Sequence, residues 1–347
     1  MNDKITIGVT GLNAIDSPGP GVGVIRSLRD CKDFDVRIIG LSYDALEPGV
    51  YMHDLVDKTY QIPYPSAGSE PLKKRLEHIH SIEKIDVIIP NFDAELANYI
   101  KLGPELKKWG IHTFLPSMEQ LEVLDKMHLA EFGEKNGFLV PKTKTISSVQ
   151  QIDDLGDEFD FPMVVKGRYY EAYIAKSKAQ VETYFHKLNA KWGLPVIIQE
   201  FVNGTEIDIA GLGDGKGNLV GAIPMRKLYI TSNGKGWSGV VLGDDNLVEM
   251  ARKFVKASKW KSGFELELMR TEDEKYYVME VNPRFPAWIF TTAAAGQNLP
   301  AALVKLVLKM PIKYFTEYEV GKMFVRYSWD LITDISEFHQ LSTTGEL

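Results

Sequence analysis

Apolar and amphipathic segments alternate along the first third of the chain. Short apolar runs predict buried strands, at residues 5–11, 36–41, 87–90 and 112–115. Apolar positions with helical spacing mark the segments between them, at residues 24–29, 72–82 and 95–102. Strands that alternate with helices imply a parallel sheet with crossover connections. The pattern therefore predicts a small, doubly wound α/β domain.

The pattern changes after a single long segment with helical spacing at residues 119–136. Strands predominate beyond it, at residues 161–166, 196–202, 206–211, 219–223 and 323–329. Helices are expected at residues 178–189 and 297–310. Strands that follow one another with few helices between them are typical of an α+β arrangement. The chain therefore combines an α/β part with an α+β part.

The segment 263–284 has the most informative chemical pattern. Two stretches alternate apolar and polar residues, and the polar run Thr-Glu-Asp-Glu-Lys between them predicts a hairpin turn. Glu280 and Asn282 are two positions apart and share a face of their strand, as Glu265 and Glu267 do on the other strand. Pairing of the strands can bring Glu267, Glu280 and Asn282 together. Their oxygen atoms suit Mg²⁺, and ordinary surface carboxylates are the alternative.

Composition and charge exclude several classes of protein. The chain has 347 residues, 44% hydrophobic and 25% charged, which allows two or three domains. Its net charge of −7 does not favour nonspecific nucleic-acid binding. The single Cys31 cannot form an intrachain disulfide, no apolar run approaches the roughly 20 residues that span a bilayer, and the first residues lack an apolar signal core. We therefore expect a soluble cytoplasmic protein without a nucleic-acid or membrane partner.

Two features of the first domain allow more than one interpretation. The glycine-rich stretch 19–23 lacks a complete dinucleotide fingerprint, and no acidic residue ends the second predicted strand, which argues against a dinucleotide site. Asp93 lies between a predicted strand and a predicted helix. It either lines a ligand crevice at the carboxyl end of the strand or caps the helix.

The string Glu-x-Asn-Pro-Arg at 280–284, preceded by a strand that carries carboxylates, resembles the metal-binding end of ATP-grasp enzymes. The resemblance covers most of the chain, and the carboxylate–amine ligase and carbamoyl-phosphate-synthetase-like branch is the most similar. It implies an ATP-grasp fold of mixed α/β and α+β class with an N-terminal Rossmann-like, pre-ATP-grasp domain at 1–118. A linker helix with the central lobe would occupy 119–202, and the C-terminal lobe with the metal site would occupy 203–347.

The same resemblance implies ATP and Mg²⁺, or Mn²⁺, as cofactors, with Glu267, Glu280 and Asn282 as the metal ligands. Lys126, on the linker helix, resembles the first lysine that faces the phosphates. Lys166, at the end of an apolar strand, resembles the second.

The residues that would bind the base and the sugar lie further along the chain. Gln199, Glu200, Phe201 and Val202 resemble the hinge that binds adenine, partly through backbone groups. Glu206 resembles the residue near the ribose. Asp208, two positions later, is expected to lie on a solvated strand face.

Three basic residues are the predicted catalytic groups. Arg226 and Lys227 resemble a basic position that reaches the phosphates or the acyl group. Arg284 resembles the arginine that stabilises the transferring phosphoryl group, and a planar, permanently charged guanidinium suits that task. Substrate-facing residues are expected on variable loops, such as Trp237, Tyr169 or Trp288.

One stretch departs from the family pattern. Family members carry a Gly/Ser-rich loop over the phosphates after the second lysine, whereas here Lys166 precedes Gly-Arg-Tyr-Tyr-Glu-Ala-Tyr. Tyr169, Tyr170 and Tyr173 cannot approach phosphate as closely as glycine. We expect this aromatic loop to pack on the substrate or a neighbouring lobe, with Arg168 taking over part of the phosphate contact. Weak nucleotide binding or loss of chemistry is the alternative.

The resemblance implies an ATP-dependent ligase. A substrate carboxylate would attack the γ-phosphate to give an acyl phosphate and ADP, and an amine would then displace phosphate to form an amide or peptide bond. Such transfers depend on positioning and charge neutralisation, and the sequence shows no Ser/His/Asp nucleophile. The expected partners are a small carboxylate and a small amine, and a homodimer is allowed because dimers are the commonest assembly. A degenerate nucleotide-binding or scaffold protein and a phosphotransferase on the same fold are the alternatives.

Overall fold

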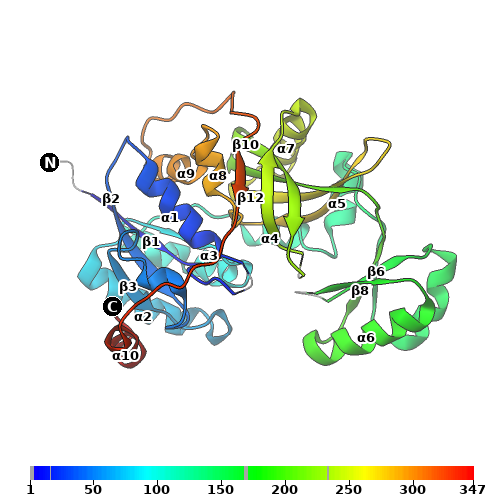
Figure 1. Ribbon diagram of the computed structural model, residues 1–347, viewed down its shortest axis with the longest axis horizontal. Helices are drawn as coiled ribbons and strands as arrows, with labels where there is room; N and C mark the ends of the chain where they lie inside the picture. The colour runs from blue at the N-terminus through cyan, green and yellow to red at the C-terminus, as the bar shows by residue number, and fades with distance from the viewer. Residues whose placement is uncertain (1–3, 16, 168–170, 233) are drawn as a thin grey trace. The chain divides into compact units, whose positions relative to one another are not determined.

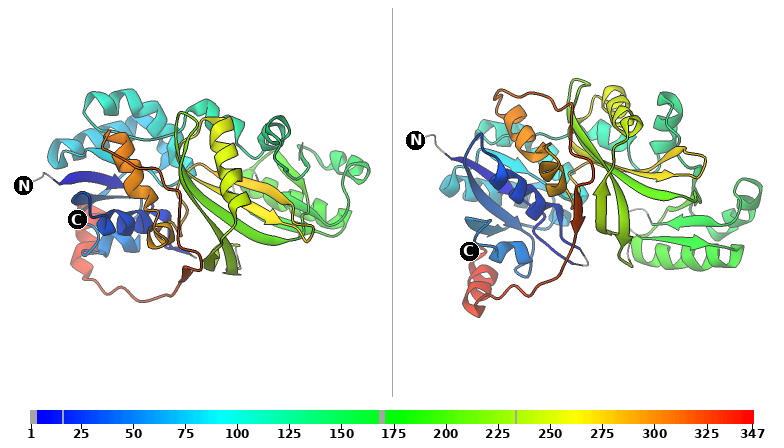
Figure 2. Two further views of the ribbon diagram at one scale, coloured as in Figure 1. Left: turned by 90° about the horizontal axis from the view of Figure 1, so that it is seen from above. Right: turned by 45° about the horizontal axis from the view of Figure 1, so that its top comes forward.

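The computed structural model describes residues 4–15, 17–167, 171–232 and 234–347 (Figure 1 and Figure 2). The strands are β1 (Ile5–Val9), β2 (Val36–Ser42), β3 (Lys58–Gln61), β4 (Val87–Ile89), β5 (Thr143–Ile146), β6 (Met163–Lys166), β7 (Ala172–Ala175), β8 (Val196–Glu200), β9 (Thr205–Asp214), β10 (Leu219–Ile230), β11 (Gly236–Val241), β12 (Lys261–Arg270), β13 (Tyr276–Asn282) and β14 (Met323–Val325).

The α-helices are α1 (Pro20–Asp30), α2 (Ser69–Glu83), α3 (Asp93–Lys108), α4 (Met118–Val123), α5 (Leu129–Asn136), α6 (Lys178–Trp192), α7 (Asp245–Ser258), α8 (Phe290–Ala294), α9 (Leu299–Val307) and α10 (Ile335–Thr344). The 3-10 helices among the described residues are η1 (Pro48–Tyr51), η2 (Pro65–Ala67) and η3 (Val149–Asp157). None of the helices in the described part of the chain is long and apolar enough to cross a membrane.

The chain forms two compact units. One contains Met1–Met118, Asp208–Glu265 and Asn282–Leu347, and we call it the first unit. The other contains Glu119–Ile207 and Leu266–Val281, and we call it the second unit.

The first unit begins with a parallel sheet of strand order β3-β2-β1-β4. The predicted strands at its start therefore pair in parallel, as expected. The strand β3 was not predicted, because Lys-Thr-Tyr-Gln lacks an apolar pattern, although Tyr60 is buried. The predicted strand at 112–115 is wrong. Only His112 forms a bridge, with Val87, and Pro116 follows without an N–H to continue a ladder.

The glycine-rich turn after β1 serves close packing of the backbone. A Cβ atom at Gly21 would lie 2.1 Å from the carbonyl oxygen of Thr10 and 2.6 Å from that of Gly11. The N–H of Gly21 donates to the Gly11 carbonyl at 2.9 Å, which holds the start of α1 against the end of β1. Only glycine permits this approach, so the turn has a structural reason that needs no nucleotide.

The second unit contains an antiparallel sheet of strand order β5-β8-β6-β7. Helix α6 lies along one face of this sheet (Figure 1). Met163 and Val165 of β6 are buried in the core that includes Phe185 of α6. Because side chains alternate along a strand, Val164 and Lys166 point to the opposite face. The lysine is therefore directed away from the hydrophobic core of this unit.

The single helix predicted at 119–136 is wrong, because α4 and α5 are separate helices. Asp125 lies between them, and its Oδ1 accepts hydrogen bonds from the N–H groups of Met127 at 2.8 Å and His128 at 3.2 Å. An aspartate that bonds nearby backbone groups competes with the helical pattern. Lys126 consequently lies in a turn between two helices and not on a helix.

A six-stranded sheet has the order β13-β12-β9-β10-β11-β14. The predicted hairpin between β12 and β13 is present. In its turn, the N–H of Thr271 donates to the carbonyl of Lys275 at 3.0 Å, and Glu274 has a positive φ of 59°. This hairpin carries Glu265, Glu267, Glu280 and Asn282.

Candidate functional site

Two lysines and two carboxylates of the second unit lie within electrostatic range of one another. The Nζ of Lys126 is 3.2 Å from Oε1 of Glu280, and both side chains are partly buried. Lys166, at the end of β6, interacts electrostatically with Glu280, Lys126 and Glu267. We call these four residues the charged cluster. Two cations suit the phosphates of a nucleotide, and two carboxylates suit a divalent cation.

Burial shifts the pKa values in the charged cluster. It lowers the pKa of Lys166, and Lys126 lowers that pKa further, while Glu280 and Glu267 oppose the shift. Burial likewise raises the pKa of Glu280, with a further increase from Glu267, while Lys126 and Lys166 oppose it. The two shifts mean that the surroundings do not fully stabilise the charged forms of Lys166 and Glu280. A bound anion near Lys166 and a bound cation near Glu280 would each stabilise the charged form.

The predicted adenine hinge follows β8 in the same unit. Gln199 is buried and its Nε2 donates to Oγ1 of Thr143 at 3.2 Å. The N–H of Glu200 donates to the carbonyl of Lys142 at 2.8 Å, and the Lys142 N–H donates back to Oε2 of Glu200 at 3.1 Å. Phe201 and Val202 come after this last pairing. Neither forms a backbone hydrogen bond with another described residue, so their polar groups are available to a base.

The aromatic stretch after Lys166 is only partly described. Arg168, Tyr169 and Tyr170 lie outside the described residues. The expectation that Tyr173 belongs to a loop over the substrate is wrong, because Tyr173 is on β7 opposite Val165. Its hydroxyl donates to Glu171 at 2.8 Å, and its ring stacks on Tyr184 of α6 with centroids 4.8 Å apart. Tyr173 therefore packs within its own unit.

A second cluster lies in the first unit and is centred on Glu265. This buried carboxylate accepts hydrogen bonds from Nδ2 of Asn282 at 3.0 Å and from Nε1 of Trp288 at 2.8 Å. Nη1 of Arg284 lies 3.6 Å from the same carboxylate, and Nε of Arg284 lies 3.2 Å from Asp93. Since Trp288 is buried and bonded to Glu265, the expectation that it faces a substrate is wrong.

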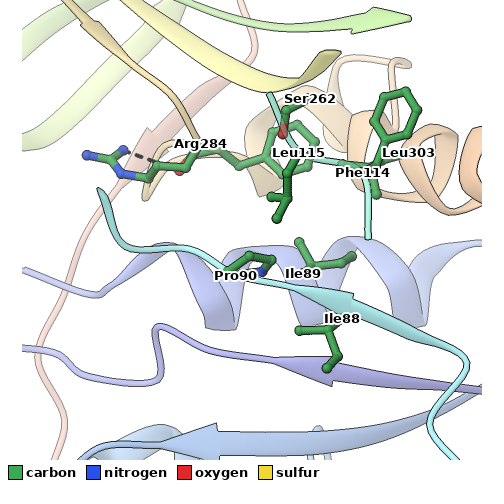
Figure 3. A pocket seen from close by; sticks show the side chains of 9 residues that line it. Ile88, Ile89, Pro90, Phe114, Leu115, Ser262, Arg284 and Leu303 are labelled. Atoms are coloured by element: carbon green, nitrogen blue, oxygen red, sulfur yellow. Dashed lines mark hydrogen bonds between the residues drawn. The ribbon is translucent and has the colours of Figure 1, made fainter. Parts of the chain in front are cut away.

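Arg284 also borders the small pocket drawn in Figure 3. The pocket is lined mainly by apolar side chains, and its space of about 10 Å³ holds at most one water molecule. Figure 3 shows the guanidinium extending away from the apolar lining residues. The pocket is therefore too small for a substrate, and the charged end of Arg284 points elsewhere.

The other predicted basic residues lie on β10. Arg226 is exposed, whereas Nζ of Lys227 lies 3.4 Å from Oδ1 of Asp208 and both side chains are buried. The expectation that Asp208 lies on a solvated face is therefore wrong. Strand β9 lies inside the six-stranded sheet, and a carboxylate buried there requires a cation. Glu206, also on β9, is partly buried.

Asp93 was expected either to line a ligand crevice or to cap a helix, and the structure gives it another role. Helix α3 begins at Asp93, but Glu95 bonds the orphan donors at its start, accepting from the N–H groups of Asn91 at 2.6 Å and Phe92 at 2.9 Å. Asp93 instead pairs with Arg284. A glutamate at the third position of a helix is typical of a capping box, so the sequence did contain a signal for the role of Glu95.

The structure separates the predicted site residues into two groups. Glu267 and Glu280 belong to the charged cluster with Lys126 and Lys166, while Asn282 bonds Glu265. Within the described ranges, no three His, Cys, Asp or Glu side chains are grouped as a metal cluster. Sequence reasoning missed the role of Glu265, although its strand position, two before Glu267, was the signal.

A comparison with protein families matches residues 194–327 to the family described as ATP-grasp in the biosynthetic pathway with Ter operon. Among curated proteins, the carbamoyl phosphate synthase large chain of Campylobacter jejuni is 23% identical over 315 residues. The match covers 83% of this chain and 28% of that protein, so the chain spans little more than a quarter of this relative's length.

Solved structures include proteins whose folds are similar to that of this chain. The biotin carboxylase of Campylobacter jejuni, in complex with β,γ-ATP, has a TM-score of 0.72 at 14% identity, covering 92% of this chain and 74% of that one. The N5-carboxyaminoimidazole synthetase of Staphylococcus aureus has a TM-score of 0.66 at 15% identity, covering 92% and 81%. These similarities establish a shared mixed α/β fold.

Proposed function

Because the chain belongs to the ATP-grasp superfamily, in its carboxylate–amine ligase and carbamoyl-phosphate-synthetase-like branch, we propose that it is an ATP-dependent ligase joining a carboxylate to an amine. The products besides the amide or peptide would be ADP and phosphate. The N-terminal part, 1–118, would be a Rossmann-like pre-ATP-grasp domain, followed by a central lobe at 119–202 and a C-terminal lobe at 203–347.

The charged cluster is the observation that carries this proposal. Lys126 and Lys166 would bind the phosphates of ATP, since desolvation lowers the pKa of the partly buried Lys166 and a bound anion would oppose that shift. The backbone groups of Phe201 and Val202, which bond no backbone group of another described residue, would bind adenine beside Gln199 and Glu200. Glu206 would approach the ribose, and Arg168 would add a phosphate contact.

The donor set fits Mg²⁺ or Mn²⁺. Glu267 and Glu280 would supply carboxylate oxygens. The amide nitrogen of Asn282 donates to Glu265, so the carbonyl oxygen of Asn282 would serve as the third ligand. Hard cations take such oxygen ligands together with substrate phosphates. When bound, the ion neutralises charge on the phosphates of ATP.

The residues of the chain would position the reactants and neutralise their negative charge, and no covalent enzyme intermediate is required. A carboxylate oxygen of the substrate attacks the γ-phosphorus, the bond from that phosphorus to the bridging oxygen breaks, and ADP leaves. Arg284 would neutralise charge on the phosphoryl group in flight, and Arg226 or Lys227 would hold the acyl group. The amine then attacks the acyl carbon, phosphate leaves, and the amine releases a proton.

Trapping with hydroxylamine tests the reaction class. In the presence of MgATP and a pool of carboxylates, hydroxylamine should convert the acyl phosphate to a hydroxamate, in proportion to the ADP released. ADP release without hydroxamate would indicate the phosphotransferase alternative. ATP binding without any ADP release would indicate the nucleotide-binding or scaffold alternative.

Replacement of Lys166 by Ala should weaken ATP binding by at least about tenfold, because it removes a partly buried cation from the charged cluster. Lys178→Ala is the matched control. Lys178 is exposed at the start of α6 and pairs with Asp153, so its loss should leave ATP affinity unchanged. Calorimetric titration with a nonhydrolysable ATP analogue measures both, and equal affinities for the two variants would reject the assignment of Lys166.

A further inference from the structure

The carboxyl end of the parallel sheet in the first unit holds buried oxygen atoms that accept no hydrogen bond. Oδ1 of Asn13, Oε2 of Glu47 and Oδ1 of Asn91 have no partner among the described residues. Asn91 is fully buried, and Glu47 is 6% exposed. Buried polar atoms are nearly always satisfied, by the protein or by something bound to it. All three atoms are acceptors, so the group that satisfies them must be a donor.

The position of Asn91 in the sheet is one where ligands bind. The strand order β3-β2-β1-β4 reverses direction between β1 and β4, and open α/β sheets bind ligands beyond the carboxyl ends of the strands at such a point. Nδ2 of Asn91 donates to the carbonyls of Thr10, just after β1, at 3.0 Å and of Ile89, in β4, at 2.9 Å. Because the nitrogen and oxygen of an amide point in different directions, the unpaired Oδ1 is turned away from these two carbonyls.

Two buried carboxylates, Glu47 and Glu95, lie at the same end of the sheet. The N–H of Tyr43 donates to Oε1 of Glu47 at 3.0 Å, and the Tyr43 hydroxyl donates to Glu95. Desolvation raises the pKa of Glu47 to about 7; hydrogen bonds from the backbone of Tyr43 and Asp44 oppose the shift, and the charges of Asp44 and Glu95 add to it. These neighbouring charges are negative, so a bound cation would stabilise the ionised form of Glu47.

Aromatic rings lie beside these carboxylates. The ring of Tyr43 stacks on that of Tyr64, with centroids 5.7 Å apart, and lies 5.9 Å from the ring of Phe92. Tyr64 is 55% exposed, so the aromatic series reaches the surface. The faces of aromatic rings attract organic cations, and rings grouped with carboxylates are typical of sites that bind ammonium ions.

Asp93 connects this end of the sheet to Arg284. It directly follows Phe92, and Nε of Arg284, the arginine proposed to act on the phosphoryl group, lies 3.2 Å from its carboxylate. The described acidic side chains do not form a metal cluster, so the features do not indicate a metal ion. We call the following residues the sheet-end site: Asn13, Tyr43, Glu47, Tyr64, Asn91 and Phe92.

We propose that the sheet-end site binds the amine substrate as an organic primary ammonium ion. Such an ion carries three N–H donors, which would satisfy Asn13, Glu47 and Asn91. Its carbon chain would contact the rings of Tyr64 and Phe92. The inference rests on the proposed function for the role of this ligand as a substrate, and it adds that the amine is a cation with an apolar body.

Isothermal titration calorimetry of the full chain without ATP tests the site. The probe is phenethylammonium chloride, and the neutral alcohol 2-phenylethanol has nearly the same shape without the charge. We expect the ammonium ion to bind at least about tenfold more tightly than the alcohol, because hydrogen bonds to charged groups are the stronger ones. Equal affinities would indicate a purely apolar site, and heat of binding from potassium chloride alone would indicate an inorganic cation. Either result would overturn the proposal.

Two variants identify the residues that bind the probe. Glu47→Gln keeps an acceptor for the N–H of Tyr43 but removes the charge, and should weaken binding by at least about tenfold. Tyr64→Ala removes an exposed ring and should weaken binding by about threefold. Glu77→Gln, at an exposed position of α2, is the control and should leave the affinity unchanged. Unaltered affinity in both site variants would contradict the proposed location.

Proton release supplies a readout that a change in packing would not imitate. With a pKa of about 7, Glu47 is roughly half protonated at pH 7. A bound ammonium ion favours the ionised carboxylate, so about half a proton should leave per bound probe, and none in Glu47→Gln. Titrations in two buffers of different ionisation enthalpy measure this number, and equal release in both proteins would remove Glu47 from the site. The measurements need no ATP, so their failure would leave the hydroxamate test of the proposed function unaffected.

Discussion

Replacing Glu280 by Gln is expected to abolish Mg²⁺-dependent ATP turnover, with a loss of roughly a thousandfold or more, while the protein stays folded. Glu280 shares a strand face with Asn282 and lies next to Lys126 and Lys166 in the charged cluster. The amide has almost the same shape but cannot supply the negative charge that a divalent cation requires. It also removes the negative charge that pairs with Lys126.

Two measurements separate this effect from general damage. ADP formation at saturating Mg²⁺, with a carboxylate and amine pair found by screening, reports turnover, and Mn²⁺ binding followed by electron paramagnetic resonance reports the metal directly. Glu274→Gln is the matched control, because Glu274 is in the turn of the same hairpin, exposed and paired with Arg270. Turnover and Mn²⁺ affinity near those of the unaltered protein in Glu280→Gln would remove Glu280 from the metal site.

Periodicity predicted the parts of the fold that repeat a simple pattern. The hairpin from β12 to β13 and the parallel strands β1, β2 and β4 were found because their alternation or apolar runs are unbroken. Strand β3 was missed because burial of Tyr60 in the sheet, and not a local pattern, makes Lys58–Gln61 a strand. The break between α4 and α5 was missed because one side chain, Asp125, decides it.

The candidate site was likewise predictable only where local strand geometry determines it. The spacing of Glu267, Glu280 and Asn282 follows from strand geometry, and the proximity of Glu280 to Lys126 and Lys166 agrees with the resemblance. The partners of buried carboxylates could not be predicted. Asp208 and Glu265 alternate along their strands like any solvated residue, and only tertiary contacts reveal the ion pair with Lys227 and the hydrogen bonds from Asn282 and Trp288.

Glu265 itself is expected to control catalysis without touching a substrate. Its carboxylate holds the amide of Asn282 and lies beside Arg284, so it orients two groups that are proposed to act on the metal and on the phosphoryl group. Residues that orient metal ligands typically contribute about 10–100-fold to affinity or activity. We expect Glu265→Gln to lower kcat and to weaken activation by Mg²⁺ within that range, with little change in KM for ATP.

The different effects on kcat, on Mg²⁺ activation and on KM for ATP distinguish a positioning role of Glu265 from a purely structural one. A purely structural role for Glu265 would lower the melting temperature but leave kcat of the folded fraction and the Mg²⁺ activation constant unchanged. Trp288→Phe supplies an internal comparison, since it removes one hydrogen bond to Glu265 and keeps the contacts with Asn282 and Arg284. Its effect on kcat should be smaller than that of Glu265→Gln. If the two variants reduce kcat equally, packing around Trp288 rather than the orientation of Asn282 and Arg284 is what Glu265 provides.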